Sequence, residues 1–419
     1  MQRQKKKLGV LFLDLDDFKR INDTLGHHVG DLVLQETGKR LLESIRASDV
    51  MTRTGMNQDG TSLARLGGDE FTVLLSMIES SDDAAVIAER IRVNLSRAHI
   101  FENHELFTTS SIGLAIYPDD GEEAEELLKH ADMAMYNSKR EGGNRYSYFS
   151  ASMTSIAVRR LSLETHLRKA IERSEFELHY QPVLDLTSGL FSGLEALLRW
   201  NSPELGRVHP EEFIPVAEET GLINKIGEWV LRTACTQVQY WRNKLDLPLI
   251  RIAVNVSAVQ ILQKGFSSLI LNMLADTGLP PEILEIELTE SILIKDESVV
   301  LDVLIALKKI GVILTIDDFG TGYSSMRLLK NFPIDRLKID QMFVRNLEQD
   351  ASNTAIASAV IALAESMGMA VTAEGVETPG QLAFLKSKNC HEVQGWYLCS
   401  ALDSSEVESF FRQIHSKAS

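Results

Sequence analysis

The stretch Val312-Ile-Leu-Thr-Ile-Asp-Asp-Phe-Gly-Thr-Gly322 carries the pattern that decides the fold. Its first five residues are apolar or β-branched. They end abruptly in two carboxylates and a glycine-rich turn, as a buried strand does where it enters a loop. Asp317 and Asp318 would repel each other there unless a cation lay between them. The stretch therefore predicts a strand whose carboxyl end binds a cation.

The C-terminal part of the chain repeats this alternation of short apolar runs and helical segments. Eight strands alternating with helices predict a (β/α)8 TIM-like barrel, so the fold class is α/β. The predicted strands are Glu177–Leu184, Ser192–Leu198, Ile250–Val256, Leu284–Leu288, Val312–Ile316, Arg336–Ile339, Met369–Ala373 and Glu392–Leu398.

Five of these strands end in a group that binds metal or phosphate, and Glu195 joins these groups from the second strand. Because the carboxyl ends of barrel strands face one mouth, we expect these side chains to converge. Five carboxylates and one amide are hard oxygen donors, which suit Mg²⁺ or Mn²⁺. Any one of the carboxylates alone could be a helix N-cap, whereas a lysine in a buried strand needs an anionic partner. The groups are Glu195, Asn255, Glu287, Asp317, Asp318, Lys338 and Glu374.

A second α/β pattern precedes the barrel. Its first strand, Leu8–Leu13, runs into Asp14-Leu-Asp16-Asp17, and strands and helices then alternate as far as Gly142-Gly143. A chain of 419 residues exceeds the size at which a single core stops growing, so we expect two domains. The predicted domains are an α/β sheet domain over residues 1–149 and the barrel over 164–412. A helical linker over 150–163 joins them.

The composition of the chain limits which partners it can bind and in which cell compartment it is expected. The net charge of −16 is spread along the chain, which argues against a nucleic acid as a partner. The three cysteines show no metal-binding spacing and cannot all pair, so we expect a reducing, cytoplasmic compartment. No apolar run approaches the roughly 20 residues that span a bilayer. The alternative is the cytoplasmic part of a larger membrane-anchored protein with a sensor domain upstream of Met1.

Eight blocks in the C-terminal part match one known family in order. They are His179-Tyr-Gln-Pro182, Glu195-Ala-Leu-Leu-Arg-Trp200, Asn255-Val-Ser257, Glu287-Leu-Thr-Glu290, Asp317-Asp-Phe-Gly-Thr-Gly-Tyr-Ser-Ser325, Leu337-Lys-Ile-Asp340, Ala373-Glu-Gly-Val-Glu377 and Gln394-Gly395. They resemble the EAL phosphodiesterase family, and a chance match to the nine-residue block alone is negligible. The resemblance implies a (β/α) barrel, two Mg²⁺ or Mn²⁺ ions and hydrolysis of cyclic di-GMP to linear pGpG.

The resemblance also implies a role for each matching position. The first metal would be held by Glu195, Asn255, Glu287 and Asp317, and the second by Asp317, Asp318 and Glu374. Lys338 would hold the attacking water, Gln394 would orient water, and Glu290 would anchor the loop from Asp317 to Ser325. We expect the catalytic group to comprise Lys338, Glu374, Glu290 and Gln394. Gln181, Arg199, Asp340 and Glu377 are expected to contact the substrate.

The N-terminal part carries a second resemblance. Its blocks are Phe12-Leu-Asp-Leu-Asp-Asp-Phe-Lys19, Ile21-Asn-Asp-Thr-Leu-Gly-His27, Gly67-Gly-Asp-Glu-Phe71 and Ala131-Asp-Met-Ala-Met-Tyr136. Gly67 to Glu70 alone would read as a hairpin turn, but together the blocks resemble the GGDEF diguanylate cyclases. The resemblance implies GTP with Mg²⁺. The metal would be held by Asp14, the backbone of Leu15 and Asp69, with Glu70 as base or metal partner, and GTP by Lys19, Asn22, Asp31, Gly67, Gly68 and Lys139.

Two departures make synthesis by this part less certain than GTP binding. The terminal Gly-Arg-Asn-Arg of the family stands here as Gly142-Gly143-Asn144-Arg145, so an arginine that contacts phosphate is missing. Arg46 and Asp49 have the spacing of the family's inhibitory product site but lie well upstream of Gly67. We interpret this pair as a helix-end ion pair or as solvated residues.

We therefore expect a cyclic di-GMP phosphodiesterase with a GTP-binding regulatory domain. One alternative is a bifunctional enzyme that also condenses two GTP molecules. A single cyclase domain binds one GTP, so synthesis needs two domains facing each other, and a homodimer is the expected assembly. The other alternative is a receptor that binds cyclic di-GMP without cleaving it.

Overall fold

The computed structural model describes residues 7–46, 62–101, 104–245, 250–294, 297–320, 326–347 and 349–418. Asp49 of the pair discussed above lies outside the described residues. The chain packs as two compact units, Met1–Leu161 and Ser162–Ser419. Helix α5 (Ala151–Ala170) belongs to both, because Arg160 lies over the Tyr136 ring of the first unit while Leu167 is buried in the core of the second.

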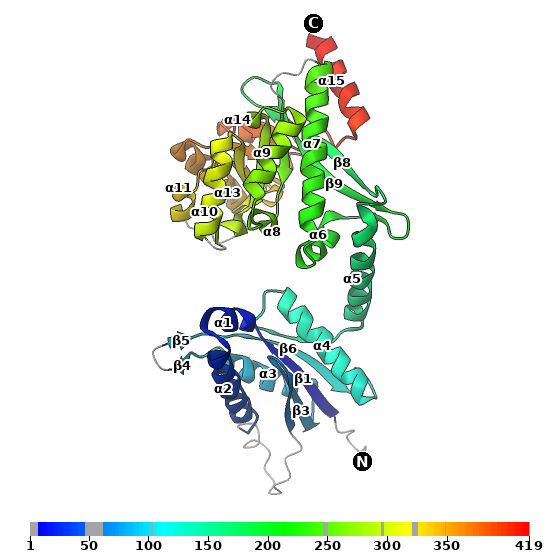
Figure 1. The fold of residues 1–419 in the computed structure, drawn as a ribbon, viewed down its shortest axis with the longest axis vertical. Helices are drawn as coiled ribbons and strands as arrows, with labels where there is room; N and C mark the ends of the chain where they lie inside the picture. The colour runs from blue at the N-terminus through cyan, green and yellow to red at the C-terminus, as the bar shows by residue number, and fades with distance from the viewer. Residues whose placement is uncertain are drawn as a thin grey trace. The chain divides into compact units, whose positions relative to one another are not determined.

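The N-terminal unit is a five-stranded sheet in the order β2-β3-β1-β6-β7 (Figure 1). Its strands are β1 (Lys7–Leu15), β2 (Ser62–Gly67), β3 (Glu70–Ile78), β6 (Ser110–Tyr117) and β7 (Tyr146–Tyr148). Only β6 and β7 pair in parallel. The strand predicted at Leu8 is present as β1. The segment from Gly67 to Glu70, which alone would read as a hairpin turn, does join the antiparallel strands β2 and β3.

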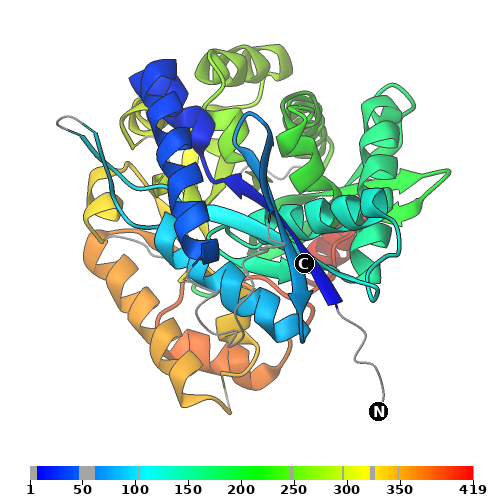
Figure 2. The same cartoon turned by 90° about the horizontal axis from the view of Figure 1, so that it is seen from below.

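Helices cover both faces of this sheet. Leu11, Leu13 and Leu15 pack with α1 (Phe18–Leu25), α2 (His27–Arg46) and α3 (Ser81–Leu95), and Figure 2 shows α2 and α3 over one face. The alternate residues Val10 and Phe12 pack against α4 (Ala124–Arg140). The unit is completed by a small hairpin of β4 (His99–Phe101) and β5 (His104–Leu106). The period of two along β1 thus gives each face its own core.

The C-terminal unit is a closed barrel, as predicted. Its strands run in the order β9-β11-β12-β13-β14-β15-β16-β8, and β8 pairs back onto β9. Their bounds are β8 (Phe176–Asp185), β9 (Phe191–Ser202), β11 (Arg251–Asn255), β12 (Leu284–Thr289), β13 (Ile313–Phe319), β14 (Arg336–Ile339), β15 (Ala370–Ala373) and β16 (Glu392–Val393). The short β10 (Gly206–Val208) adds to β9.

The first barrel strand departs from the expected alternation. β8 is antiparallel to both of its neighbours, and residues 186–190 join it to β9 as a hairpin with no helix. Asp185 accepts hydrogen bonds from the backbone of Thr187 and Ser188, and Gly189 has a φ of 70°. A parallel crossover needs a dozen or more residues, so this short turn can only reverse the chain.

Helices surround the barrel strands (Figure 1). The longest, α7, buries Ile226, Val230, Ala234 and Val238 on one stripe at helical spacing. None of the described helices is long and apolar enough to cross a membrane. The helices are α6 (Pro210–Glu219), α7 (Ile223–Leu245), α8 (Ala258–Ile261), α9 (Phe266–Thr277), α10 (Glu297–Ile310), α11 (Met326–Asn331), α12 (Gln341–Val344), α13 (Ala351–Met367), α14 (Pro379–Ser387) and α15 (Ser404–Ala418). Two 3₁₀ turns, η2 (Pro281–Ile283) and η3 (Glu290–Ile294), flank β12.

Candidate active site

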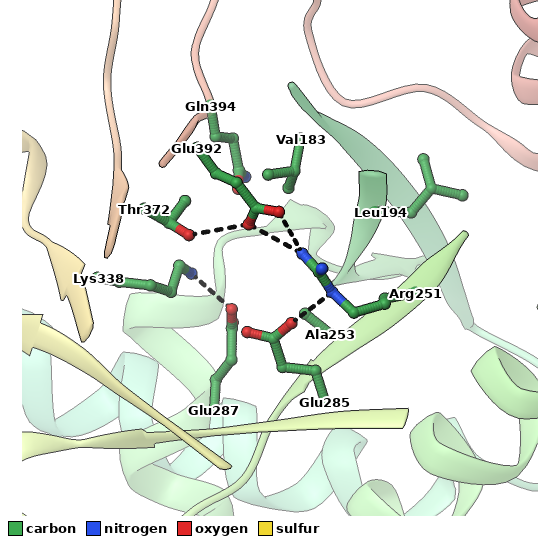
Figure 3. A pocket seen from close by; sticks show the side chains of 11 residues that line it. Val183, Leu194, Arg251, Ala253, Glu285, Glu287, Lys338, Thr372, Glu392 and Gln394 are labelled. Carbon is green, nitrogen blue, oxygen red and sulfur yellow. Dashed lines mark hydrogen bonds and ion pairs between the residues drawn. The ribbon is translucent and has the colours of Figure 1, made fainter. Parts of the chain in front are cut away.

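Lys338 stands at the centre of the predicted metal-binding residues. It lies on β14 and is only 2% exposed. Its Nζ is 2.5 Å from Glu374 Oε1, 2.9 Å from Glu287 Oε1, 3.4 Å from Glu195 Oε2 and 3.5 Å from Asp317 Oδ1. Four carboxylates from four different strands or strand ends therefore meet around one ammonium group, and Figure 3 shows Lys338 directed at Glu287.

Burial and mutual repulsion strongly perturb these groups. The pKa of Glu374 is raised to about 8, by burial and by Asp317 and Glu195, although Lys338 opposes the shift. Burial likewise raises the pKa values of Glu287 and Asp317. The pKa of Lys338 is raised well above its usual value, because the carboxylates around it outweigh its burial. One lysine does not balance four buried carboxylates, so the site has room for further positive charge.

The donor set fits divalent cations. Oxygens of Glu195, Asp317 and Glu374 all lie within 4.8 Å of one another. Oε2 of Glu287 is buried and has no hydrogen-bond partner among the residues described. Oxygen donors at this spacing, with an unbalanced negative charge, are what Mg²⁺ or Mn²⁺ requires.

Three amide side chains hold Glu195 and its surroundings. Asn255 donates to Glu195 Oε1 at 2.7 Å, and Gln394 donates to Glu195 Oε2 at 2.7 Å. Gln394 also donates to Gln181 Oε1 at 2.9 Å, and Gln181 donates to the carbonyl of Cys399. Burial tends to raise the pKa of Glu195, but Lys338 and the hydrogen bonds from Gln394 and Asn255 together lower it. Glu195 is thus held as a carboxylate in one orientation.

The two adjacent aspartates face different partners. Asp318 has a φ of 54°, a left-handed conformation that aspartate tolerates better than most residues. Asp317 reaches Lys338, whereas the Asp318 carboxyl hydrogen-bonds with Asp340. The pKa of Asp318 is raised to about 7 by burial, by Asp317 and by Asp340. Asp318 therefore lies beside the carboxylate cluster and not within its tightest group.

Glu290, the residue predicted to anchor the loop after β13, contacts the start of that loop. Oε2 of Glu290, which is 3% exposed, accepts a hydrogen bond from the backbone of Gly320 at 3.0 Å. Residues 321–325 lie outside the described residues. Asp340 accepts from the backbone of Met342 and so also begins α12. Glu290 and Asp340 thus each hold a backbone segment near the carboxylates around Lys338.

A cavity of about 340 Å³ opens above the carboxylates. Two of the four predicted substrate residues line it. Gln181 and Glu377 line the cavity, whereas half-buried Arg199 donates to the carbonyl of Leu198. The sequence interpretation did not single out Arg345 or Trp396, which also line it. Trp396 is 76% exposed. Its position directly after Gln394-Gly395 is the feature of the sequence that could have indicated a place at the cavity.

The residues predicted to bind GTP gather more loosely in the N-terminal unit. Lys139 Nζ lies 2.6 Å from Asp14 Oδ1, and Asp14 is paired with Glu70 across β1 and β3. Burial raises the pKa of Asp14 to about 6, with Asp69 and Glu70 adding to the shift and Lys139 opposing it. The side chain of Asn22 fills the space beside Gly30. Leu15 is buried, and Lys19, Asp31, Gly67 and Gly68 are exposed.

Family models match both halves of the chain. The model for the EAL domain matches residues 164–401. This chain belongs to the EAL domain family. The model for the diguanylate cyclase GGDEF domain matches residues 1–145, so a GGDEF domain precedes the EAL domain.

Curated relatives match this chain over nearly its whole length. It is 42% identical over 405 residues to the bifunctional diguanylate cyclase/cyclic di-GMP phosphodiesterase MucR of Pseudomonas aeruginosa, covering 97% of this chain and 57% of MucR. It is 38% identical over 410 residues to the cyclic di-GMP phosphodiesterase NbdA of the same organism, covering 97% of this chain and 50% of NbdA. The chain thus spans about half the length of the curated relatives it matches.

A solved structure supports the barrel. The PaMucR phosphodiesterase in complex with c-di-GMP is 41% identical, covers 59% of this chain and 99% of its own, and has a TM-score of 0.57. The predicted eight-strand barrel is therefore confirmed, with the reversed first strand as the difference in detail.

Proposed function

We propose that the barrel hydrolyses cyclic di-GMP to linear pGpG with two Mg²⁺ or Mn²⁺ ions. The observation that carries the proposal is the contact of buried Lys338 with four carboxylates beneath an open cavity. Nearby relatives carry names for this activity, and one related structure is named as its c-di-GMP complex. A receptor that only binds the dinucleotide would not need this full set of ligands.

The proposed reaction is the addition of one water to one phosphodiester. The water oxygen bonds to phosphorus, the bond from phosphorus to a 3′ oxygen breaks, and the water proton ends on that oxygen, leaving a 5′-phosphate. Bound divalent cations would polarise the phosphate and lower the pKa of the attacking water. Glu195, Asn255, Glu287 and Asp317 would hold one cation, and Asp317, Asp318 and Glu374 the other.

The chain's own residues would orient the reactants. Lys338 would hold the water by its ammonium group and offset the charge that develops on phosphate. Gln394 would fix Glu195 and water together, since it already donates to Glu195. Glu290 would set the start of the loop at Gly320. Gln181, Arg199, Asp340 and Glu377 would contact the dinucleotide.

The product and the origin of its oxygen test the proposal. The protein is incubated with cyclic di-GMP and Mg²⁺ in ¹⁸O-water, and the products are analysed by chromatography and mass spectrometry. We expect pGpG with one ¹⁸O in its 5′-phosphate, no product with a chelator, and restored turnover after addition of Mn²⁺. Absence of turnover with both metals would contradict the proposal.

We further propose that the N-terminal domain binds Mg²⁺-GTP and regulates the barrel. The contact between Asp14 and Lys139 supports this, because a bound cation and phosphate would take the place of these partners. Asp14, Leu15, Asp69 and Glu70 would hold the cation, and Lys19, Asn22, Asp31 and the Gly67-Gly68 turn the nucleotide. Turnover of cyclic di-GMP measured with and without GTP tests the regulation. Formation of cyclic di-GMP from GTP alone would support the bifunctional alternative.

A further inference from the structure

A second group of ionised side chains lies inside the barrel, next to Lys338 and Glu287; Figure 3 shows three of its members, Arg251, Glu285 and Glu392. Arg251 Nη2 donates to both oxygens of Glu392, at 2.7 and 2.8 Å, and Arg251 Nε donates to Glu285 Oε2 at 3.2 Å. Arg336 donates to Glu392 and lies 3.6 Å from Glu285. These four residues, Arg251, Glu285, Arg336 and Glu392, are called the floor network below. Its formal charge is zero.

Hydroxyl groups extend the floor network around the barrel. Ser192 donates to Glu392 Oε1 at 2.7 Å, and Thr372 donates to Glu392 Oε2 at 3.2 Å. Thr315 donates to Glu285 Oε1 at 2.5 Å. With the four ions, these groups join β9, β11, β12, β13, β14, β15 and β16. The floor network and these three hydroxyl groups together therefore link all seven parallel strands of the barrel.

The register relates the floor network to the active site. Along five strands or their carboxyl ends, a floor residue or hydroxyl lies two positions before a predicted functional residue, a spacing that places both on the same side of a strand. The pairs are Glu285 with Glu287, Thr315 with Asp317, Arg336 with Lys338, Thr372 with Glu374, and Glu392 with Gln394. Two residues along a strand span roughly 6.6 Å. Each of these functional residues is thus two positions along the chain from a residue that the floor network or its hydroxyl groups hold in place.

Little solvent separates the two layers. A cavity of about 10 Å³ is lined by Glu287 and Lys338 from the site and by Arg251, Glu285 and Glu392 from the floor network. A volume of this order holds about one water molecule. A charge in the floor network therefore acts on the site with little screening.

Stability alone does not account for such a network. Barrel interiors are usually filled by branched apolar side chains. Replacing a buried ion pair by packed apolar residues is often neutral or stabilising, because the ions lose their hydration. The four ions lie close to the cation site, so their total charge contributes to the electrostatic potential that a bound cation would experience.

We infer that the floor network is a positioning and charge-balancing device that sets how tightly the carboxylates above it bind divalent cations. The inference rests on the proposed function, which supplies the cation site. Glu392→Gln leaves the floor with one positive charge and weakens cation binding. Arg336→Gln leaves one negative charge and strengthens it. The double variant Arg336→Gln/Glu392→Gln restores neutrality and returns the affinity toward that of the parent protein.

Calorimetric titration of Mn²⁺ into the metal-free full chain tests the inference. A unit charge about 10 Å from a divalent cation in a partly buried site acts strongly enough for changes of about tenfold or more. We expect Glu392→Gln to bind Mn²⁺ at least tenfold more weakly and Arg336→Gln more tightly than the parent. The double variant should lie within about threefold of the parent. Glu228→Gln, which alters an exposed ion pair on α7, is the matched control and should leave the affinity unchanged.

The outcomes separate the inference from the proposed function. If the parent chain binds no Mn²⁺, the proposed function fails. If it binds Mn²⁺ but both single variants weaken binding equally, or none changes it, the inference is overturned. Circular dichroism and thermal unfolding without metal confirm that each variant folds. A single variant that does not fold is replaced by Glu285→Gln or Arg251→Gln, which make the same changes of charge.

Discussion

Two lysines that contact carboxylates show how differently the two halves of the chain build a site. Lys338 is 2% exposed and lies within 3.5 Å of four carboxylates on the barrel. The side chain of Lys139 is 37% exposed and contacts Asp14 in the N-terminal unit. Buried strands hold the first group in place before any ligand arrives. The second group lies at a helix end and a hairpin turn, where ligands can rearrange it.

The largest effect on turnover is expected from removing Lys338 from the buried group of carboxylates. Lys338→Met removes the ammonium group that would hold water and offset charge, so we expect turnover of cyclic di-GMP to fall about 10²- to 10³-fold. Lys244→Met, which removes an exposed ion pair with Glu408, is the control and should change turnover less than twofold. Retention of full activity by Lys338→Met, measured as pGpG formed per minute, would refute its assigned role.

Metal removal should affect the stability of the barrel. Cations that bind only the folded state stabilise it by about 2.7 kcal/mol at 100 times their dissociation constant. We expect Mn²⁺ to raise the unfolding temperature of the chelator-treated protein, and Asp317→Asn to reduce that increase. Calorimetric unfolding scans measure both. An unfolding temperature that does not respond to Mn²⁺ would count against a cation site.

Substitutions at two glycines in α2 test whether Asn22 belongs to the predicted GTP site of the N-terminal unit. A Cβ added at Gly30 would lie 2.0 Å from Asn22 Oδ1, whereas one added at Gly38 meets nothing within 4 Å. Gly30→Ala should displace Asn22 and weaken GTP binding at least tenfold, a shift of roughly 1.4 kcal/mol. Gly38→Ala should leave GTP binding unchanged and stabilise the helix by about 0.5–1 kcal/mol. Fluorescence titration with a labelled GTP distinguishes them, and equal affinities would remove Asn22 from the site.

The smallest expected effect is a pH dependence in the N-terminal unit. Burial, assisted by Arg40, lowers the pKa of His99 to about 4, below its unfolded value of about 6.5. A depressed histidine pKa means that the unfolded state binds the proton first. The stability contributed by neutral His99 is therefore complete above pH 6.5 and is lost as pH falls toward 4, by about 1 kcal/mol between pH 6.5 and 5.5.

His99→Gln isolates this contribution from other titrating groups. The variant cannot take up the proton, so its loss of stability between pH 6.5 and 5.5 should be about 1 kcal/mol smaller than that of the parent. Urea unfolding at the two pH values measures the difference. Identical losses in both proteins would show that His99 does not titrate as proposed.

Local patterns predicted much of the barrel. The apolar runs that end in polar groups, such as Val312–Ile316 before Asp317, predicted the strands that are buried on both faces. The strand predicted over Glu392–Leu398 is shorter in the structure, where β16 covers Glu392–Val393. The reversed first strand was missed. Its turn at Asp185-Leu-Thr-Ser-Gly189 is a local signal that was available, because it is too short for a crossover.

The floor network was also missed, although its signal is present. Glu285 and Glu287, Arg336 and Lys338, and Glu392 and Gln394 each differ by two residues and so share a face of a strand. Which of these charges pair depends on closure of the barrel. Gln394 and Glu195 are 199 residues apart, and only the closed sheet brings them to 2.7 Å. The two-residue spacing along each strand predicts which side chains face inward, whereas the closure of the barrel decides which of them form ion pairs and hydrogen bonds.

The most direct test of the central claim compares the parent chain with Glu195→Gln in one assay. Glutamine keeps the shape of the side chain but removes the charge that Lys338, Asn255 and Gln394 surround. We predict that the parent converts cyclic di-GMP to pGpG with Mg²⁺ or Mn²⁺, and that a folded Glu195→Gln does so at least 100-fold more slowly. Equal turnover by the two proteins, or none by the parent with either metal, would contradict the account.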